Sequence, residues 1–423
     1  MKKIHFIGIG GIGMSALAQY FKDQGVEVTG SDRGASPVTE LLQKEGITVT
    51  IGQKATNVPD DADTVVYSDA VPEENPERAR AKELGIAQLS YFGMLGNVSE
   101  GKKTIAVAGT HGKTTTTGML AKILADGGAS PTAVIGSIVK DFGSNYLHGD
   151  SDLFVVEACE YRDHLLELAP KILVITNLEW DHTDWFPSLE ALQDTFKKAI
   201  VKVPTDGFIV TSPENPTIAP LLVGVQARIV DYTKTEAPEL PLPGEFNRAN
   251  ARAAAAAARL ASRDITDDSI NTSLSHFHGT WRRFEYKGET PNGVDVYDDY
   301  AHHPTAIRAT LAALRAKAKG RVFLAFHPHL YSRTRDLLED FATSFQDADE
   351  VAIAPIYAAR EVDDGTVSSE LLAEKIREHG VKAIAVSSFD EAEKFLSGAK
   401  EGDVIMTMGA GDIYKVADAL VKK

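Results

Sequence analysis

The sequence predicts an α/β protein of three domains, each built on a mostly parallel sheet. Its 423 residues are more than one ordinary hydrophobic core needs. Apolar strand-like runs alternate with helical runs along the chain, a pattern typical of parallel strands that helices cover on both faces. Two glycine-rich loops each follow a strand and open a helix, as in doubly wound folds. A composition of 43% hydrophobic and 25% charged residues is that of a folded globular chain.

Residues 1–100 form the first predicted domain. Its first strand covers residues 3–9 and runs into a Gly-x-Gly-x-x-Gly loop that opens a helix. The next strand, residues 26–32, ends at Asp32, where an acidic residue contacts a ribose in dinucleotide folds. These features indicate a Rossmann-type unit, and taken alone they favour NAD or FAD. The glycines of the loop are Gly8, Gly10, Gly11 and Gly13.

Residues 101–283 form the second predicted domain, which opens with a phosphate-loop sequence. The stretch VAGTHGKTTTT follows a strand at residues 104–108, but Val107 stands where the usual pattern has its first glycine. A bound triphosphate needs backbone N–H donors at a helix N-terminus, a lysine near its outer phosphates and a hydroxyl for the bridging metal. The stretch supplies all three, so it predicts a nucleotide site beside a parallel sheet. The predicted contacts are Gly109, Thr110, Gly112, Lys113, Thr114 and Thr115.

Polar residues at the ends of two later strands indicate a magnesium site. Mg²⁺ prefers oxygen ligands and keeps several waters, so one or two carboxylates beside the phosphates suffice. Glu157, at the end of the strand in VVEACE, is the first choice and Glu160 the second, with solvated loop carboxylates as the alternative. The next strand leads into a polar cluster, at the sheet edge where parallel sheets bind ligands. This cluster contains Asn177, Asp181, His182 and Asp184.

Residues 284–423 form the third predicted domain. Four strand-like runs, VDVYD, RVFLAF, EVAIAP and DVIMTM, alternate with helical runs and predict a third α/β unit. Polar side chains that follow consecutive strands are expected to converge. They are Tyr300, His302, His303, Arg333 and Arg335. His327 and His329 raise the alternative of a zinc site, which is disfavoured because arginines crowd the region and no cysteine assists.

Charge and patterning exclude several classes of function. A net charge of −16, without a cluster of basic residues, opposes binding to nucleic acid. The start MKKIHFIGIGGIGMS has an apolar run, but glycines interrupt it and no cleavage site follows, so we expect a strand and not a signal peptide. No stretch is long and apolar enough for a membrane span. The single cysteine, Cys159, excludes a disulfide framework, and we expect a cytoplasmic protein with no membrane partner.

Nine motifs resemble the Mur ligase family in order and spacing, over essentially the whole chain. They are FIGIGGIGMS, AGTHGKTTTT, EACE, TNLEWDHTD, PGEFNRAN, WRRFE, DDYAHHPTA, HPHLYSRTRDL and GAGD. The resemblance implies an N-terminal domain for the UDP-sugar, a central ATPase domain and a C-terminal Rossmann-like domain for the amino acid. It further implies that ATP phosphorylates the lactyl carboxylate of UDP-N-acetylmuramate. The resemblance also implies that the amine of L-alanine then attacks this acyl phosphate, in peptidoglycan precursor synthesis.

The resemblance also implies roles for single residues. The family's phosphate loop has the form Gly-Thr-x-Gly-Lys-Thr, so the departure at Val107 is expected and Lys113 would hold the outer phosphates. In PGEFNRAN, Phe246 replaces the usual histidine, which leaves Asn250 as the adenine contact. The other implied residues are Thr114, Glu157 and His182 for magnesium, Arg282 and Arg283 for the γ-phosphate, His302 and Arg335 for the substrate carboxylate and the amino acid, and Ser31, Asp32, Ser68 and Asn75 for the uridine or sugar.

Three alternatives stay open, and no sequence feature indicates an oligomeric state. A recycling ligase that joins UDP-N-acetylmuramate to a preformed tripeptide shares both glycine-rich loops and the AHHPTA run. The stretch EACEYRDHL departs from the family's commonest EADESD pattern at Cys159, Arg162, His164 and Leu165, which leaves the amino-acid specificity open. An NAD-dependent oxidoreductase would explain the first glycine loop but not the central domain. A noncatalytic regulator requires lost catalytic groups, whereas the phosphate-loop lysine and the candidate metal ligands are present.

Overall fold

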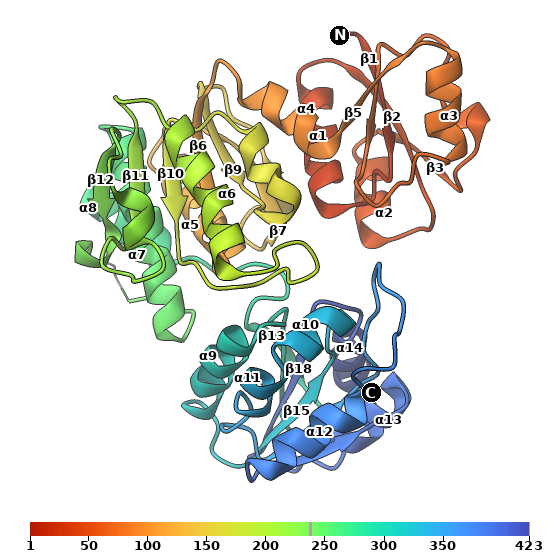
Figure 1. Cartoon of the computed structure of the whole chain (residues 1–423), viewed down its shortest axis with the longest axis vertical. Helices are drawn as coiled ribbons and strands as arrows, with labels where there is room; N and C mark the ends of the chain where they lie inside the picture. Colours follow the sequence, from red (N-terminus) through yellow and green to blue (C-terminus); the bar gives the residue numbers. More distant parts are fainter. Residues whose placement is uncertain (237–238, 423) are drawn as a thin grey trace. The chain divides into compact units, whose positions relative to one another are not determined.

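The structure, a computed structural model, describes residues 1–236 and 239–422. It contains three sheets with intervening helices and confirms the predicted three-part α/β architecture (Figure 1). Each sheet lies within one of the three predicted segments, whose boundaries stay a prediction. The chain forms two compact units. The first is Met1–Leu178, Gln193–Glu239 and Ala249–His278, and the second is Glu179–Leu192, Leu240–Arg248 and Gly279–Lys423.

The N-terminal sheet is parallel throughout its described strands. It consists of β1 (Lys3–Ile7), β2 (Glu27–Asp32), β3 (Thr48–Ile51), β4 (Thr64–Tyr67) and β5 (Ala87–Ser90), with α1 (Ile12–Asp23), α2 (Pro37–Lys44), η1 (Ala55–Asn57), α3 (Pro76–Glu83) and α4 (Tyr91–Ser99) between or after them. The strand order is β3-β2-β1-β4-β5. Ile4, Phe6 and Ile7 of the central strand β1 are fully buried. Because the order reverses beside β1, the glycine loop after β1 lies at the switch point where doubly wound sheets bind ligands.

The central sheet places the phosphate loop between two neighbouring strands. Its strands are β6 (Lys103–Ala108), β7 (Thr132–Val139), β8 (Ser144–Leu147), β9 (Leu153–Glu157), β10 (Ile172–Ile175), β11 (Phe208–Thr211) and β12 (Arg228–Asp231). The helical segments are α5 (Lys113–Asp126), η2 (Tyr161–Glu167), α6 (Leu189–Lys202), η3 (Ala219–Leu222), η4 (Tyr232–Lys234), α7 (Glu245–Ala261) and α8 (Asp267–Ser275). In the order β12-β11-β10-β6-β9-β7-β8, β6 pairs in parallel with both β9 and β10. The segments that follow these three strands therefore meet at one edge.

The C-terminal sheet is buried on both faces. Its elements are β13 (Glu285–Glu289), β14 (Asp295–Asp299), α9 (Pro304–Arg315), β15 (Val322–Phe326), α10 (Tyr331–Asp336), α11 (Leu338–Ala342), β16 (Glu350–Ile353), α12 (Ser369–Glu378), β17 (Lys382–Ala385), α13 (Phe389–Leu396), β18 (Val404–Met408) and α14 (Tyr414–Lys422). The order is β13-β14-β18-β15-β16-β17, with β13 antiparallel to β14. In β15, Leu324 and Phe326 belong to one apolar cluster and Phe323 and Ala325 to another, as side chains that alternate across a strand require.

Small side chains let α7 pack closely within the first unit. The alanine block of the helix is typical of high helix propensity, and Ala251 and Ala253–Ala258 are also buried. The proline-rich stretch before α7, residues 236–245, is typical of a loop. Residues 239–244 lie outside any helix or strand, whereas Ala237 and Pro238 lie outside the described residues.

A buried polar contact joins the N-terminal and central sheets within the first unit. The amide nitrogen of Asn145, in β8, donates to Oγ of Ser15 at 3.2 Å and to the carbonyl oxygen of Ile12, both in α1. The amide oxygen of Asn145 accepts from Gln19 at 3.5 Å. Asn145, Ser15 and Gln19 are each at most 4% exposed. The helix that follows the glycine loop is thus fixed to the hairpin of β7 and β8.

Within residues 1–236 and 239–422, none of the helices combines the length and the apolar character that a membrane crossing demands.

Candidate active site

The phosphate loop follows β6 and contains two glycines in unusual backbone conformations. Gly109 and Gly112 have φ angles of 130° and 80°, which side chains other than glycine rarely adopt. Gly112 is the N-cap of α5, so the N–H groups of the first helical turn lie beside the loop. Asn250 of α7 lies against the same loop, because a β carbon placed on Gly112 would be 2.2 Å from its amide oxygen. The structure therefore brings the predicted adenine contact to the predicted phosphate contacts.

Asn177 braces the phosphate loop from the end of β10. Its amide oxygen accepts from the backbone N–H of His111 at 2.9 Å, and its amide nitrogen donates to the His111 carbonyl at 3.0 Å. Its own carbonyl accepts from the N–H of Thr110 at 3.3 Å. Through these three hydrogen bonds, Asn177 fixes the loop. Thr115 is buried in the first turn of α5. Direct contacts of Thr110 and Thr115 with a nucleotide stay a prediction.

Lys113 is a partly buried cation at the start of α5, with its side chain 15% exposed. Its Nζ lies 2.9 Å from Oε1 of Glu160 and 3.2 Å from the carbonyl oxygen of Thr110, and it also contacts the carbonyl oxygen of Gly109. Burial lowers the pKa of Lys113, but the charge of Glu160 outweighs this effect, so the pKa lies above its ordinary value. The lysine is held protonated at the position where the outer phosphates are expected.

Thr114 and Glu157 lie together as a pair of oxygen donors. Oγ1 of Thr114 is 3.1 Å from Oε1 of Glu157, and the backbone N–H of Gly136 in β7 donates to Oε2 of Glu157 at 2.9 Å. A hydroxyl beside a carboxylate is the type of donor set that suits Mg²⁺, so these residues fit that ion. His182 belongs to the second compact unit, and its role as a further metal ligand stays a prediction.

The glycine loop of the N-terminal sheet is closed by Asp32 and Ser68. The N–H of Gly10 donates to Oδ2 of Asp32 at 2.8 Å. A β carbon placed on Gly8, whose φ is 81°, would be 3.2 Å from Cβ of Ser68. Gly11 is the N-cap of α1, so helical N–H donors face this loop as well. The structure brings the predicted UDP-sugar residues together, and their contacts with the ligand stay a prediction.

Tyr91, at the start of α4, lies directly beneath Gly13 of that loop. A β carbon on Gly13 would be 2.5 Å from the tyrosine ring. Burial raises the pKa of Tyr91, and the negative charges of Glu157 and Asp69 raise it further. The phenol thus stays neutral and lies within the electrostatic reach of both the metal-site carboxylate and the loop after β4.

Ser31 and Asn75, two further predicted sugar or uridine contacts, take part in a network around the fully buried Glu77. The carboxylate of Glu77 accepts from Oγ of Ser31 at 2.5 Å and from Nδ2 of Asn57 at 2.6 Å, and lies 3.3 Å from Nε2 of His5. Asn75 caps α3 by accepting the N–H of Glu77 at 2.9 Å. Burial raises the pKa of Glu77, but these hydrogen bonds outweigh it and the pKa is lowered. Ser31 and Asn75 therefore support the fold of the sheet edge where the UDP-sugar is predicted to bind, and their contacts with that ligand stay a prediction.

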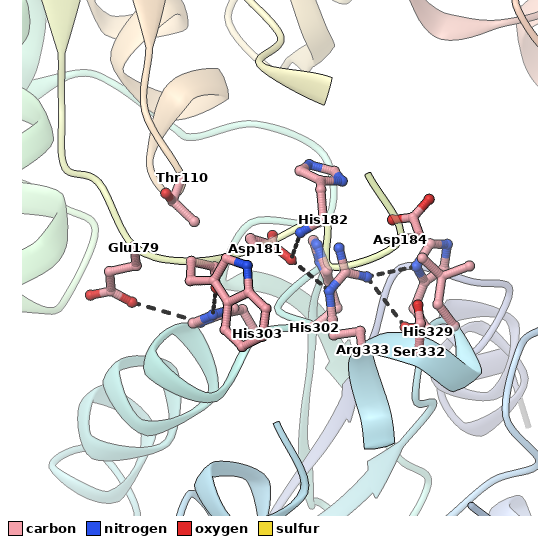
Figure 2. A network of polar contacts seen from close by, with 12 residues as sticks. Thr110, Glu179, Asp181, His182, Asp184, His302, His303, His329, Ser332 and Arg333 are labelled. Atoms are coloured by element: carbon pink, nitrogen blue, oxygen red, sulfur yellow. Dashed lines mark hydrogen bonds and ion pairs between the residues drawn. The ribbon is translucent and has the colours of Figure 1, made fainter. Parts of the chain in front are cut away.

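In the second unit, Asp181 and Arg333 form a buried ion pair, shown in Figure 2. Nε of Arg333 is 2.7 Å from Oδ1 of Asp181, and the two side chains are 1% and 5% exposed. Nη1 of Arg333 is 2.9 Å from Nδ1 of His329. Burial raises the pKa of Asp181, but Arg333 outweighs burial and holds the pKa well below its usual range. In the same network, Nδ1 of His303 is 3.7 Å from the carboxylate of Glu179.

The predicted residues His302 and Arg335 have different surroundings. Nδ1 of His302 is 2.9 Å from the carbonyl oxygen of Tyr300. Burial and the charge of Arg333 lower its pKa far below the ordinary value, so the ring is neutral. Arg335 is 42% exposed and pairs with Asp364 at 3.2 Å. Arg333, rather than Arg335, lies with His302, and the catalytic role predicted for Arg335 stays a prediction.

The two arginines of WRRFE also differ. Arg282 is 3% exposed, and its guanidinium donates to Asp298 at 2.8 Å and to the carbonyls of Gly411 and Gly409 at 2.7 and 2.6 Å. It therefore holds the turn after β18. The guanidinium of Arg283 lies 4.8 Å from the ring centre of Tyr300. Contact of either arginine with the γ-phosphate stays a prediction. Arg283 is the better candidate, because the guanidinium of Arg282 is already engaged by Asp298, Gly409 and Gly411.

Sequence reasoning missed Gly136, Tyr91 and Glu77, and it did not foresee the pair of Asp181 with Arg333. Gly136 and Tyr91 belong to no motif, so no local signal marked them. Glu77 follows Asn-Pro at a helix start, and this local pattern is typical of a helix cap and not of a buried carboxylate. Asp181 and Arg333 were both candidates, but 152 positions separate them in the sequence.

Three family models match successive parts of the chain. "Mur ligase family, catalytic domain" matches residues 3–103, "Mur ligase middle domain" residues 107–237, and "Mur ligase, glutamate ligase domain" residues 282–411. Together they cover most of the 423 residues, in the same order as the three sheets.

Several relatives align with the whole chain. The UDP-N-acetylmuramate--L-alanine ligase of Clostridium botulinum (strain Loch Maree / Type A3) is 39% identical over 99% of this chain and 97% of its own length. That of Clostridium novyi (strain NT) is 40% identical over 100% and 97%. Among solved structures, UDP-N-acetylmuramate-alanine ligase MurC of Thermotoga maritima superposes with a TM-score of 0.81 at 30% identity, covering 100% of this chain and 99% of that one. A murein peptide ligase from Psychrobacter arcticus gives 0.74 at 26%, covering 100% and 98%. On these full-length similarities and on all three domain matches, the chain belongs to the Mur ligase family.

Proposed function

We propose that this chain is an ATP-dependent ligase that joins L-alanine to the lactyl carboxylate of UDP-N-acetylmuramate, in peptidoglycan precursor synthesis. The observation that supports the proposal is the phosphate loop, beside which Lys113 pairs with Glu160 and Thr114 contacts Glu157, the cation and the oxygen donors expected at a nucleotide triphosphate. Full-length relatives at 39% and 40% identity bear the name of this activity. The NAD-dependent alternative leaves this loop without a use.

The chemistry required is the activation of a carboxylate. A carboxylate is a poor electrophile, and a mixed anhydride with phosphate makes its carbon open to attack by an amine. Lys113 neutralises charge that develops on the transferring phosphoryl group, as cations do in phosphoryl transfer generally. Thr114 and Glu157 would hold Mg²⁺, which supplies further neutralisation of the phosphate charge. The backbone N–H of Gly136 keeps the Glu157 carboxylate in place.

The two substrates other than ATP are assigned to different parts of the chain. The glycine loop of the first unit, with Asp32 and Ser68, binds the UDP-sugar through helical N–H donors. In the second unit, Arg333 and the neutral His302 form the candidate region for the amino acid. Because the reaction consumes ATP, we infer a cytoplasmic enzyme.

The second candidate function is that of a ligase that adds a preformed tripeptide. The similarity to the murein peptide ligase, at 26% identity, favours considering this function. The two functions share the donor carboxylate and differ in the amine. Steady-state amide formation with L-alanine, glycine, L-serine and the tripeptide separates them. Turnover with the tripeptide and none with L-alanine would reject the first proposal.

An isotope experiment tests the acyl phosphate directly. UDP-N-acetylmuramate labelled with ¹⁸O in its carboxyl group is supplied with ATP and L-alanine. One labelled oxygen must appear in the inorganic phosphate, because the carboxylate oxygen stays with phosphorus when the amine displaces it. Amide formation without labelled phosphate would refute the mechanism. Lys113→Ala should abolish this turnover and leave UDP-sugar binding nearly normal.

A further inference from the structure

The segment Cys159–Leu165 contains the residues that depart from the family's commonest pattern, and these departures left the amino-acid specificity open. The segment starts two residues after the metal-site carboxylate Glu157 and continues into η2. It belongs to the first compact unit, which also contains the whole N-terminal sheet. Its contacts within that unit indicate which substrate the departures concern.

His164 attaches the segment to the N-terminal domain. Its ring stacks on Phe92 of α4, with ring centres 3.7 Å apart and planes 15° from parallel. Nε2 of His164 lies 3.4 Å from the carboxylate of Asp69, which follows β4. The helix α4 also approaches η2 closely at Gly96, where a β carbon would be 2.6 Å from the carbonyl oxygen of Glu167. The segment is therefore held against the elements that surround the glycine loop.

The residues before His164 form a turn of unusual conformation. Arg162 has φ and ψ of 52° and 30°, and Asp163 has 62° and 16°. Two consecutive left-handed residues other than glycine are unfavourable and persist only where the surroundings fix them. Here the N–H of Asp163 donates to the carbonyl oxygen of Glu160 at 3.0 Å, and its carboxylate accepts from the hydroxyl of Thr195. Arg162 is exposed in this turn, and its guanidinium carbon lies 5.5 Å from the ring centre of Tyr161.

Arg162 is a positive charge that interacts with Asp69, after β4, whereas the glycine loop has no basic residue of its own. Residues 8–15 of the glycine loop, GIGGIGMS, contain no basic residue. Burial raises the pKa of Asp69, and the charge of Arg162 opposes this rise. The residue before Asp69 is Ser68, whose Cβ would lie 3.2 Å from a β carbon placed on Gly8. Arg78 also interacts with Asp69, but its guanidinium lies over the ring of Tyr67 at 3.8 Å and donates to the Val71 carbonyl at 3.1 Å. Of these two arginines, Arg162 is the exposed one.

We propose that Arg162 binds the diphosphate of the UDP-sugar, and that the segment Cys159–Leu165 sets recognition of the nucleotide-sugar and not of the amino acid. The inference rests on the proposed function for the identity of that substrate. A guanidinium presents donors in a planar fork that matches two phosphate oxygens, and the helical N–H groups of α1 bind the other oxygens. Asp69, whose pKa burial raises and the charge of Arg162 lowers, is then an anion that competes with the diphosphate.

The test is Arg162→Gln, compared with Arg80→Gln as a matched control. Arg80 is a partly exposed arginine of the same unit, which pairs with Asp60 and Glu83. Loss of a hydrogen bond to a charged group predicts that KM for UDP-N-acetylmuramate rises about ten- to a hundredfold in the Arg162 variant. KM for ATP and for L-alanine should not change, and the control should behave as the wild type. An unchanged KM for the UDP-sugar, or a rise confined to L-alanine, overturns the proposal.

Asp69→Asn separates ligand binding from a merely structural role. If Arg162 only fastened the segment through Asp69, both variants would raise KM for the UDP-sugar alike. Direct binding predicts that Asp69→Asn leaves this KM unchanged or lowers it, because a competing anion is lost. Calorimetric titration with UDP and with uridine gives a readout that needs no amino acid. Arg162→Gln should weaken UDP and not uridine, and equal weakening of both would refute the proposal even if L-alanine is not the substrate.

Discussion

The buried pair of Asp181 and Arg333 allows a sharp test of the second unit. In Asp181→Asn the shape of the side chain is kept, but Arg333 loses its counter-charge at 1% exposure. Removal of one partner of a buried ion pair costs about 3–5 kcal/mol, because the other charge stays buried without compensation. We therefore expect the free energy of unfolding of the second unit to fall by about that amount.

The same loop provides the control. Asp184 pairs with Arg360, and these two side chains are 14% and 38% exposed. Asp184→Asn removes the same chemical group from a more hydrated pair, so a loss of about 1 kcal/mol or less is expected. The sequence has 3 tryptophans, and all of them, Trp180, Trp185 and Trp281, lie in the second unit, so tryptophan fluorescence during urea unfolding follows that unit. Equal losses in the two variants would refute the reasoning from burial.

The pH dependence of this difference has a definite sign. The pKa of Asp181 is depressed in the folded protein, with burial opposing and Arg333 prevailing. The pair therefore contributes its full stability above the ordinary carboxyl pKa, near about 4, and this contribution is lost as the pH falls through the lower folded pKa. The gap between wild type and Asp181→Asn should be constant near neutral pH and should narrow below about pH 4. A gap that persists in stronger acid would contradict the assignment.

Three further predictions concern other parts of the chain. Gly136→Ala would put a methyl group 2.3 Å from Oε2 of Glu157, so we expect a lower kcat and a higher Mg²⁺ requirement in a titration of activity, and an unchanged Mg²⁺ curve would argue against the metal site. Arg282→Lys should lower the free energy of unfolding by about 3 kcal/mol or more, because buried hydrogen bonds are lost. Arg283→Lys should instead reduce turnover and leave the free energy of unfolding nearly unchanged. The reverse pattern in unfolding and rate assays would contradict these roles. Burial lowers the pKa of His329 to about 3. The free energy of unfolding should therefore be highest above the pKa of an unfolded histidine, about 6.5, and should fall by up to about 1.4 kcal/mol per pH unit as the solution becomes more acidic. In His329→Gln, the free energy of unfolding should depend less steeply on pH. An unaltered slope would show that His329 does not cause the acid-side loss of stability.

The sheets and the phosphate loop were predictable because their signals are local. A buried strand, a glycine turn and a helical start follow one another within about a dozen residues, and each has its own period or composition. Lys113, Thr114 and Glu157 were found in this way, and the structure brings them together. The hairpin of β7 and β8 is not announced by any motif, although it supplies Gly136 to the metal-site carboxylate.

Residues of the same type could not be ranked from the sequence. Arg333 and Arg335 are two positions apart and chemically identical, but Arg333 points into the packed unit and is 1% exposed, whereas Arg335 is 42% exposed. Arg282 and Arg283 differ in the same way, since one is fully engaged by the turn after β18. Such differences arise from burial and from partners remote in the sequence, which periodicity does not encode.

The contact of Asn145 with α1 affects how this protein can be cut into stable fragments. The first hundred residues have a complete set of strands, yet Ser15 and Gln19 are shielded from water by a hairpin that follows in the sequence. A fragment truncated before that hairpin would uncover these polar groups and the packed side of the helix. Expression boundaries drawn around one sheet would then yield a weakened piece, whereas melting of Met1–Leu178 in the intact chain should be cooperative across both sheets.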